Sequence, residues 1–432
     1  MTAVAIPPFR LRAQMNGIAE APNKTWFFEL AATVIDAGRC VRCGACVAAC
    51  PTDSIGVSPQ DLPLLVKMCT GCSLCFDFCP RGGLRYEATW LDEAGVAASA
   101  TRAASGGGAG GNASNEAAGA RVVGVPPAPD LGATLLRRAV RVRPGSKLAS
   151  ASAQDGGFVS AVLIAALEAG AIDGALVARE DPTTPWRGVP YLATTREEVA
   201  AAGGSFYNQT LALAALDLDA AGLRGDARIA LVGTPCEIQG IRALQRRAWR
   251  RGRSRVDAVV LSIALMCTKS FDYEALMLGA LARDRQVPLE KVTKVDVIHG
   301  RLLVFGPDGE RLVDEPVKGF HDAALKGCDE CADFLGRAAD LSVGSVGSAA
   351  GFSSVLVRTS VGLRAYERVL GEVEVADLER PDALEKLDRL DHERARQSLQ
   401  RPLDPDGALF IDLSEHLAAY AQGDRAPVWR GR

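Results

Sequence analysis

The chain has 432 residues, of which 48% are hydrophobic, and a formal net charge of −3. This length suffices for two or three domains, and the nearly balanced charge argues against nucleic acid or an anionic membrane surface as a partner. No run reaches the roughly 18 uninterrupted apolar residues of a membrane span, and the first residues lack a signal-peptide core. We therefore expect a cytoplasmic protein, or one that docks to a membrane complex through partners.

The first predicted domain is an α+β, ferredoxin-like unit at residues 25–92, which follows an irregular segment at residues 1–24. It begins with a helix at Thr25–Gly38, TWFFELAATVIDAG, because Trp26, Leu30 and Val34 recur every four positions and Gly38 can end the helix. We expect this helix to pack on the rest of the unit.

Two cysteine motifs with the same spacing, CVRCGACVAACP and CTGCSLCFDFCP, lie between Cys40 and Pro80. The spacing C-x2-C-x2-C-x3-C-P is the ligand pattern of a [4Fe–4S] cluster, and in tandem motifs the fourth cysteine ligates the other cluster. The alternative is zinc, but zinc sites usually pair two C-x2-C units or include histidine, and no histidine precedes His299. The two predicted ligand sets are Cys40, Cys43, Cys46 and Cys79, and Cys69, Cys72, Cys75 and Cys50.

Residues 93–135 form a predicted linker that is rich in Ala, Gly and Ser and contains the run ASGGGAGGN at Ala104–Asn112. This composition is typical of a flexible chain. The linker leaves the position of the ferredoxin unit open, so contacts between folded parts must fix it.

Residues 136–372 form a larger predicted α/β domain with a mixed, mostly parallel sheet. Short apolar runs rich in β-branched residues predict strands, and amphipathic stretches between them predict helices. The predicted strands are Arg228–Val232, Val256–Met266, Ala339–Val343 and Ser354–Thr359. The predicted helices are Gly156–Gly170, Ile238–Arg246 and Tyr273–Ala282. Residues 373–432 complete the chain as a charged, exposed helix at Pro381–Gln400 and a Pro-containing tail.

Four further cysteines lie in the larger domain. Cys236 and Cys267 each follow a predicted strand, and ligands in an open α/β sheet gather at the carboxyl ends of strands. Together with the pair Cys328 and Cys331 they could form a third [4Fe–4S] site. The alternative is that these cysteines are buried as small apolar residues.

The segment from about Ala153 to Gly371 resembles the family of beta subunits of coenzyme F420-reducing hydrogenase and F420H2 dehydrogenases. The resemblance covers about half of the chain, and an N-terminal two-cluster ferredoxin is similar to that of the input subunit of F420H2 dehydrogenases. It implies FAD and one [4Fe–4S] cluster in the larger domain, bound by the four cysteines named above. The stretches that carry it are Ala153–Val177, VGTPCEIQGIRALQ (Val232–Gln245), LMCTKSFDY around Cys267, KVDVIHG (Lys294–Gly300), GCDECADF (Gly327–Phe334) and Ala339–Thr359.

One part of the pattern departs from the family. Members that use the deazaflavin often have an acidic residue and Asn after the middle cysteine, where this chain has Thr268, Lys269 and Ser270. The family also contains flavin–iron–sulfur reductases that act on a vinyl group of chlorophyll precursors or on 6-hydroxynicotinate. The resemblance therefore implies the cofactors more firmly than the substrate.

Candidate FAD contacts begin at Gly156 and Gly157, because the amides and dipole of a helix N-terminus attract phosphate, with Ser160 adding a hydroxyl. The alternative is a plain loop-to-helix junction. Lys269 is a candidate catalytic residue that could meet an anionic substrate or donate a proton, and its alternative is an exposed lysine. Lys294 is a candidate phosphate partner or a solvated lysine. The remaining candidate cofactor contacts are Gly233, Thr234, Gly344, Ser345 and Gly347.

These features predict an oxidoreductase that exchanges a hydride at FAD with coenzyme F420 or a nicotinamide nucleotide. It would pass single electrons through three [4Fe–4S] clusters to or from a ferredoxin or partner subunit. One alternative is a ferredoxin-dependent reductase of a C=C bond or an aromatic ring in a small molecule. Another is a non-catalytic electron-transfer subunit of a larger complex.

Overall fold

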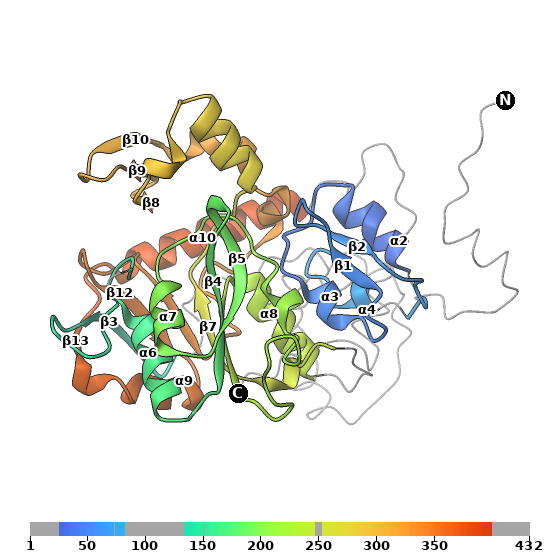
Figure 1. Cartoon of the computed structure of the whole chain (residues 1–432). Helices are drawn as coiled ribbons and strands as arrows, with labels where there is room; N and C mark the ends of the chain where they lie inside the picture. Colours follow the sequence, from blue (N-terminus) through green and yellow to red (C-terminus); the bar gives the residue numbers. More distant parts are fainter. Residues whose placement is uncertain (1–25, 73, 83–133, 151, 247–252, 400–432) are drawn as a thin grey trace, which may run out of the picture.

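The computed structural model describes residues 26–72, 74–82, 134–150, 152–246 and 253–399 (Figure 1). The predicted irregular segment 1–24, residues 93–133 of the predicted linker and the tail from residue 400 lie outside the described residues.

The centre of the larger domain is an eight-stranded sheet with the strand order β13-β3-β12-β11-β7-β6-β4-β5. All four predicted strands are confirmed, as β6, β7, β11 and β12. The strands are β3 (Leu136–Val142), β4 (Gly174–Asp181), β5 (Thr184–Ala193), β6 (Ile229–Gly233), β7 (Val259–Leu265), β11 (Leu341–Gly344), β12 (Ser353–Val357) and β13 (Val373–Ala376).

The sheet is mixed, as predicted, but it is not mostly parallel. The central strands β4, β6, β7 and β11 are parallel to one another, whereas every pairing outside this group is antiparallel. For two of the antiparallel pairings, β4 with β5 and β11 with β12, the reason is the kind of connection. β4 and β5 are joined by two residues and β11 and β12 by a loop without a helix, and such connections produce antiparallel neighbours.

Helices cover both faces of this sheet (Figure 1). Successive side chains of strand β6 point to opposite faces of the sheet. Ile229 and Leu231 pack with α8 on one face, and Ala230 packs with α6 and α9 on the other. The helices are α6 (Phe158–Glu168), α7 (Arg196–Ala201), α8 (Pro235–Arg246) and α9 (Ser360–Glu367), and short 3-10 helices are η3 (Ala212–Ala215), η4 (Val256–Ala258) and η9 (Leu370–Glu372).

Local sequence explains where these helices begin. Gly157 has a φ of 71° before α6, a conformation that suits glycine, and Pro235 occupies the first position of α8, where its missing N–H costs nothing. Thr195 and Glu198 form a capping box on α7, and the Thr359 hydroxyl accepts from the Gly362 amide on α9.

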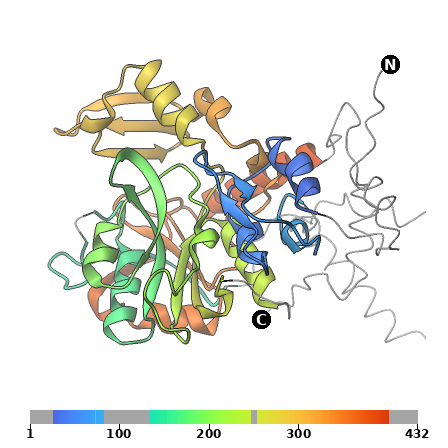
Figure 2. The same ribbon diagram turned by 45° about the vertical axis from the view of Figure 1, so that its right-hand side comes forward.

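A second, smaller sheet has the order β10-β9-β8 and its own apolar core, and it stands beside the larger sheet in Figure 2. The predicted helix Tyr273–Ala282 belongs to this part, where it is the π-helix η5 (Glu274–Arg283). The other elements are η6 (Leu289–Lys291), β8 (Lys294–Ile298), β9 (Arg301–Phe305), β10 (Arg311–Pro316), η7 (Val317–Ala323) and η8 (Lys326–Glu330).

The described part of the ferredoxin unit has a two-stranded antiparallel sheet and short helices; its ferredoxin-like fold stays a prediction. The predicted helix Thr25–Gly38 is shorter and changes from α to π, and Gly38 follows it with a φ of 70°. The elements are α2 (Phe27–Leu30), η1 (Ala31–Ile35), α3 (Ala45–Ala49), β1 (Ile55–Val57), β2 (Pro63–Leu65) and α4 (Leu74–Asp77).

The ferredoxin unit is docked on the larger domain, beside α8 (Figures 1 and 2). Val41 and Phe78 of the unit belong to the same buried apolar core as Leu213 and Ile238 of the larger domain. The Leu211 amide donates to the Arg42 carbonyl at 2.9 Å. Contacts between folded parts therefore fix its position, as the linker composition required.

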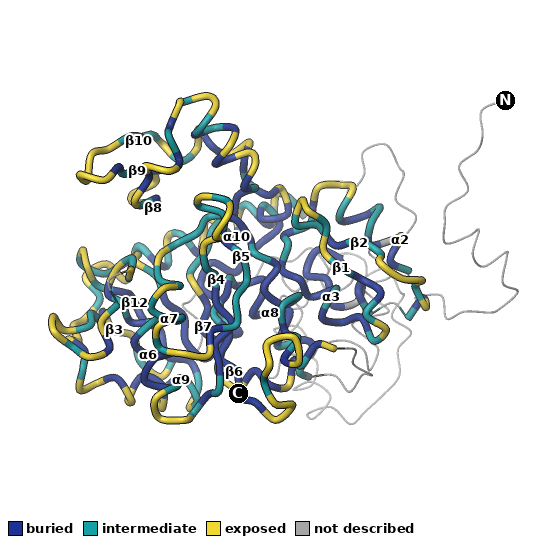
Figure 3. Tube along the Cα trace, in the orientation of Figure 1, coloured by how far each residue is buried: buried dark blue, intermediate teal, exposed yellow. Residues whose placement is uncertain are grey.

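The C-terminal helix α10 (Pro381–Leu399) forms where it was predicted, but it is exposed on one side only. Leu384 and Asp388 are fully buried and Ala395 is 2% exposed. Figure 3 colours the chain by this burial. The prediction was wrong because charge was taken to imply exposure. Asp388 is buried in an ion pair with Arg337, whose Nη2 lies 2.7 Å from its Oδ2.

Among the described residues, no helix combines the length and apolar character that crossing a membrane requires.

Candidate iron–sulfur and flavin site

The structure brings the predicted first ligand set together in the ferredoxin unit, and we call Cys40, Cys43, Cys46 and Cys79 the inner set. Burial raises the pKa of the Cys46 thiol well above its usual range, and the nearby Cys40, Cys43 and Cys79 raise it further. Burial likewise raises the pKa of Cys40 to about 12. Thiols this crowded and this buried ionise only when a cation compensates their charge, which is what an iron cluster does.

The predicted second set is also brought together, and we call Cys50, Cys69, Cys72 and Cys75 the outer set. All four cysteines line one cavity, together with Thr52, Ser54, Ile55, Leu65 and Thr70. Burial raises the pKa of the Cys75 thiol, with further contributions from Cys69, Cys72 and Cys50.

Main-chain amides point at the sulfur atoms of these sets. The amide of Arg42 lies 3.4 Å from the Cys40 sulfur, that of Ser54 lies 3.2 Å from the Cys50 sulfur, and that of Gly71 lies 3.4 Å from the Cys69 sulfur. Hydrogen bonds to the sulfurs are one of the features that set the reduction potential of an iron–sulfur cluster. The residues therefore fit the clusters that their spacing predicts.

The remaining four cysteines, Cys236, Cys267, Cys328 and Cys331, are the third set. Cys236 lies in the first turn of α8 after β6, and Cys267 follows β7, so both stand at the carboxyl edge of parallel strands. The pKa of the Cys267 thiol is raised by burial and then by Cys328 and Cys331, and that of Cys236 by burial, Cys43, Glu237 and Cys331. The fold thus brings together cysteines that are up to 95 residues apart in the sequence.

The third set adjoins the inner set. Cys43 raises the pKa of the Cys236 thiol, and the two cysteines belong to the same buried core. The Leu213 amide donates to the carbonyl of Cys43 at 3.3 Å. The ferredoxin unit therefore presents Cys43, rather than a cysteine of the outer set, to the larger domain.

All twelve cysteines are free thiols, and no three His, Cys, Asp or Glu side chains of the described residues lie close enough to hold a single metal ion. A four-iron cluster is held differently, because each thiolate binds a separate iron atom and the ligands stand further apart than those of one ion.

Sequence analysis missed two residues that hold the third set. Gln209 is 2% exposed; its amide nitrogen donates to the Thr234 hydroxyl at 2.9 Å, and its oxygen accepts from the Ser270 hydroxyl at 2.8 Å. It thereby joins the loops of Cys236 and Cys267. Glu237 accepts from the amides of Thr234 and Ala212, at 2.8 and 3.2 Å. Glu237 stands next to a cysteine in the sequence and could have been considered, whereas Gln209 has no local signal.

Lys269, the candidate catalytic residue, forms an ion pair with Asp329, with 2.7 Å between Nζ and Oδ1. Its side chain is only 15% exposed, so the alternative of a freely exposed lysine is wrong. The pair ties the loop of Cys267 to the loop of Cys328. This contact accounts for Lys269 structurally, and its catalytic role stays a prediction.

The candidate flavin contacts at the start of α6 lie in the same region as the candidate Lys294. Gly156 is buried and Gly157 precedes the helix, while Ser160 in the first turn is half-buried. The Gln154 side chain donates to the Val295 carbonyl on β8 at 3.3 Å, which brings the neighbouring Lys294 to the same region. The Lys294 ammonium is paired with Asp296 at 2.9 Å, so a phosphate there would compete with that carboxylate.

The glycine at position 156 also has a packing reason. A Cβ atom there would lie 2.6 Å from the Ser353 amide and closer still to the Val140 carbonyl. Packing at this loop-to-helix junction therefore accounts for Gly156, and its contact with a phosphate stays a prediction.

The other candidate cofactor contacts lie at the carboxyl edge of the sheet or beyond it. A Cβ at Gly233 would meet Glu237, and one at Gly344 would meet the Met266 side chain. The Thr234 hydroxyl lies 3.1 Å from the Cys236 sulfur, and Ser345 is exposed. Gly347 instead faces α10, because its Cβ would lie 3.0 Å from the carbonyl of Arg380.

Comparison with protein families assigns both parts of the chain. Residues 143–217 match the N-terminal region, and residues 226–381 the C-terminal region, of the coenzyme F420 hydrogenase/dehydrogenase beta subunit. Residues 33–85 match a 4Fe-4S dicluster domain. The chain therefore carries an iron–sulfur domain ahead of the beta-subunit domain.

Individual relatives support the same family assignment. The chain is 32% identical to the beta subunit of the coenzyme F420 hydrogenase of Methanosarcina barkeri, over 54% of this chain and 78% of that protein. It is 27% identical to one of the subunits of the F420H2 dehydrogenase of Methanosarcina mazei, over 81% of this chain and 88% of that protein. Its fold is similar to a chain of the F420-reducing [NiFe] hydrogenase complex from Methanosarcina barkeri, with a TM-score of 0.57, 29% identity, and coverage of 62% of this chain and 92% of that chain. On this evidence the chain belongs to the family of coenzyme F420 hydrogenase/dehydrogenase beta subunits and is an iron–sulfur oxidoreductase component that transfers electrons.

Proposed function

We propose that this chain links a two-electron hydride carrier, coenzyme F420 or a nicotinamide nucleotide, to a one-electron partner such as a ferredoxin or a redox subunit. The inner, outer and third sets would each hold a [4Fe–4S] cluster, and the larger domain would hold FAD. Bound FAD supplies the step between two-electron hydride chemistry and one-electron iron–sulfur chemistry.

The observation that carries this proposal is that Cys43 and Cys236 lie in one buried apolar core, where the ferredoxin unit bonds to the larger domain through the Cys43 carbonyl and the Leu213 amide. It supports a continuous arrangement in which the third set adjoins the inner set. The inner set in turn adjoins the outer set, because Cys46 and Cys79 belong to the same buried core as Cys50 and Cys75. Such an arrangement suits the transfer of single electrons along the chain. The names of the relatives support F420 as one carrier to test.

The chain's own residues would hold and shield these groups. Main-chain amides and the hydroxyls of Thr234 and Ser270 approach thiolate sulfurs, so they would stabilise their negative charge. Burial of the third set keeps water away from it. The N-terminus of α6, with Lys294 nearby, offers amides and a cation to a pyrophosphate.

The test is chemical analysis of the full chain, purified without oxygen. We expect about twelve Fe and one FAD per chain, as three cubane clusters and one flavin require. About four Fe, or no flavin, contradicts the proposal. Bleaching of the flavin by F420H2 or NAD(P)H identifies the carrier, whereas bleaching only by reduced ferredoxin would favour the reductase of a small unsaturated molecule.

The variant Cys43→Ser distinguishes hydride transfer to the flavin from electron transfer through the inner set. We expect a hydride donor still to bleach its flavin, while the reduction of an external one-electron acceptor falls. If bleaching also collapsed while folding and FAD content held, the inner set would be needed for the flavin chemistry itself.

A further inference from the structure

Residues that flank the ligands of the inner set bond directly to residues that flank the ligands of the third set. Arg39 precedes Cys40, and Glu330 lies between Cys328 and Cys331. The Arg39 Nε donates to Glu330 Oε1 at 2.6 Å, and its Nη2 donates to Oε2 at 2.7 Å. Both side chains are 8% exposed, so this is a buried, bidentate ion pair.

A second arginine makes a parallel contact. Arg81 follows Cys79 by two residues and is 1% exposed, and its Nε donates to the Gly327 carbonyl, next to Cys328, at 2.6 Å. The Arg39 Nη2 also donates to the Arg81 carbonyl at 2.8 Å. The two arginines therefore bind the loop of the third set on both sides of Cys328, Arg81 at Gly327 and Arg39 at Glu330.

The fit leaves no space at Gly327. A Cβ atom at that position would collide with the carbonyl oxygen of Arg39 and would lie 2.8 Å from the Val41 side chain. The backbones of the two ligand loops are therefore in direct contact, which a loosely tethered domain does not produce.

The charges of this contact suit its position. Two buried guanidinium groups and one buried carboxylate lie between two sets of thiolates. Burial raises the pKa of the Cys79 and Cys328 thiols; Arg39 and Arg81 oppose this rise at Cys79, and Arg81 opposes it at Cys328. A buried ion pair of this kind gives little net stability against an apolar replacement, but the loss of one partner leaves an uncompensated buried charge.

We propose that Arg39, Arg81 and Glu330 are positioning residues that form a fixed junction between the inner set and the third set. The proposal rests on the ligand assignment of the proposed function. It means that the ferredoxin unit is a permanent part of the site, with the inner set held at one distance from the third set, and not a carrier that docks and leaves at each turnover.

The chain offers a matched control. Arg187 and Asp61 also join the larger domain to the ferredoxin unit, with 2.8 Å between Nη2 and Oδ1, but neither residue flanks a cysteine. Removing Asp61 therefore weakens the same interface without touching the junction. The variants to compare are Glu330→Ala, Glu330→Gln and Asp61→Asn.

The first measurement is hydrogen exchange of the full, anaerobically purified chain, which needs no activity. In Glu330→Ala we expect faster exchange in both segments 39–49 and 326–331, because the unpaired Arg39 leaves the junction open. We expect Glu330→Gln, which keeps an oxygen as acceptor, to lie between Glu330→Ala and the wild type. Asp61→Asn leaves both segments as in the wild type.

The second measurement is the rate at which the ferredoxin clusters are reduced after the flavin, with the magnetic interaction between clusters read by electron paramagnetic resonance. We expect Glu330→Ala to lower this rate about tenfold and to weaken the interaction, since a fraction of molecules has an open junction. If Glu330→Ala and Asp61→Asn showed the same hydrogen exchange and the same rate of cluster reduction, the proposed junction would be wrong. A wild-type iron content well below about twelve per chain would instead contradict the proposed function, while the comparison of exchange rates would still test the contact.

Discussion

The guanidinium of Arg394 on α10 donates to the main-chain carbonyl of Thr268, the residue after Cys267, at 2.9 Å. The same Nη2 approaches the carbonyl of Cys328 at 3.3 Å. Arg394 thus joins two ligand loops of the third set from a helix that begins where the family match ends, at residue 381. Asp391 holds the arginine in place, with 3.0 Å between the charged atoms.

We expect Arg394→Gln to weaken the third set without unfolding the chain. Residues that orient metal ligands typically contribute about 10- to 100-fold to metal affinity, so iron should leave the variant about tenfold faster when a chelator is added. The control is Arg380→Gln just before the same helix, where the arginine is exposed and, among the described residues, pairs with Asp382. Equal rates of iron loss in the two variants would show that Arg394 does not position the ligands.

Gly44 shows how tightly the ferredoxin unit is docked. Its φ is 81°, and a Cβ there would lie 2.6 Å from the amide of Ala214 and 2.9 Å from the carbonyl of Leu211, both in the larger domain. Gly145 has a similar φ of 77° but has nothing within 4 Å of a Cβ. Replacing each by alanine therefore separates backbone strain from the clash at the interface.

We expect Gly145→Ala to cost about 1 kcal/mol of the free energy of unfolding, from the left-handed conformation alone. Gly44→Ala should cost about 2 kcal/mol more, because the main chains on both sides of the interface must move apart. Denaturant unfolding of the full chain measures both losses. A similar loss in the two variants would mean that the interface adapts and that the docking is looser than the structure describes.

The sequence predicted which cysteines lie near one another better than it predicted the packing around them, and their role as cluster ligands stays a prediction. The spacing within Cys40–Pro80 is local, and the position of Cys236 and Cys267 follows from the end of a strand, which is again local. Gln209, by contrast, joins the loops of Cys236 and Cys267 from a third segment. No periodicity or spacing reports such a contact, because it depends on which loops the fold brings together.

Contacts between distant segments also explain the two wrong predictions about architecture, the mostly parallel sheet and the exposed C-terminal helix. The antiparallel flanks of the large sheet depend on which strand each short connection reaches, and a list of apolar runs does not contain that choice. The burial of α10 depends on partners such as Arg337 for Asp388, which lie in another part of the chain. Charged residues are exposed unless a distant partner is present, and only the structure supplies the partner.

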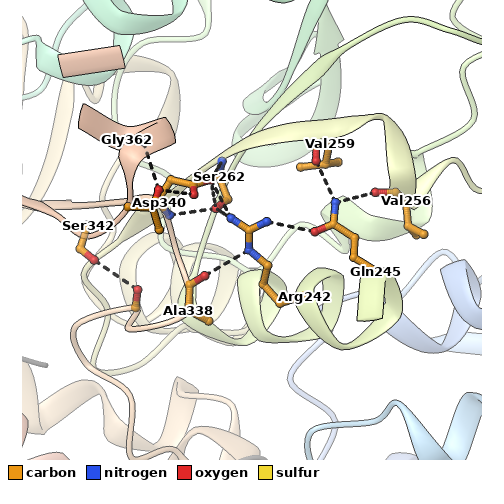
Figure 4. Close-up of polar contacts among 11 residues, drawn as sticks. Arg242, Gln245, Val256, Val259, Ser262, Ala338, Asp340, Ser342 and Gly362 are labelled. Carbon is orange, nitrogen blue, oxygen red and sulfur yellow. Dashed lines mark hydrogen bonds and ion pairs between the residues drawn. The ribbon is translucent and has the colours of Figure 1, made fainter. Parts of the chain in front are cut away.

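Asp340 is the centre of a buried network that holds the sheet of the larger domain to its helices (Figure 4). Its Oδ2 accepts from Arg242 of α8 at 2.6 Å and from the amide of Ser262 of β7 at 2.9 Å. Its Oδ1 accepts from the hydroxyl of Thr359, which caps α9, at 2.6 Å. One carboxylate that is 1% exposed therefore joins three elements.

We expect Asp340→Ala to lower the free energy of unfolding by about 3–5 kcal/mol, because it leaves the guanidinium of Arg242 without its buried counter-charge. Glu374→Ala is the control, since Glu374 pairs with Arg141 between β13 and β3 with both side chains more than 40% exposed, and pairs of this kind contribute about 1 kcal/mol or less. Denaturant midpoints give the comparison. A loss for Asp340→Ala as small as that of Glu374→Ala would mean that water or another side chain replaces the carboxylate.

His392 on α10 makes stability depend on pH. Burial lowers its pKa to about 4, and Arg337 lowers it further while Asp333 opposes the shift. Asp388, 3.6 Å from Nε2, is already paired with Arg337. The folded pKa lies below the unfolded value of 6.5, so the unfolded chain binds more protons between these values. Stability from this group is present above pH 6.5 and is lost as the pH falls towards 4.

We expect the wild type to lose about 2 kcal/mol from this group between pH 7 and pH 5, and His392→Gln to lose correspondingly less. The measurement is the difference in free energy of unfolding between variant and wild type at the two pH values, because this difference cancels any acid effect on the clusters that both chains share. His299→Asn, at an exposed turn, is the control and should follow the wild type. If His392→Gln followed the wild type as well, His392 would be protonated in the folded chain, and α10 would accommodate its charge.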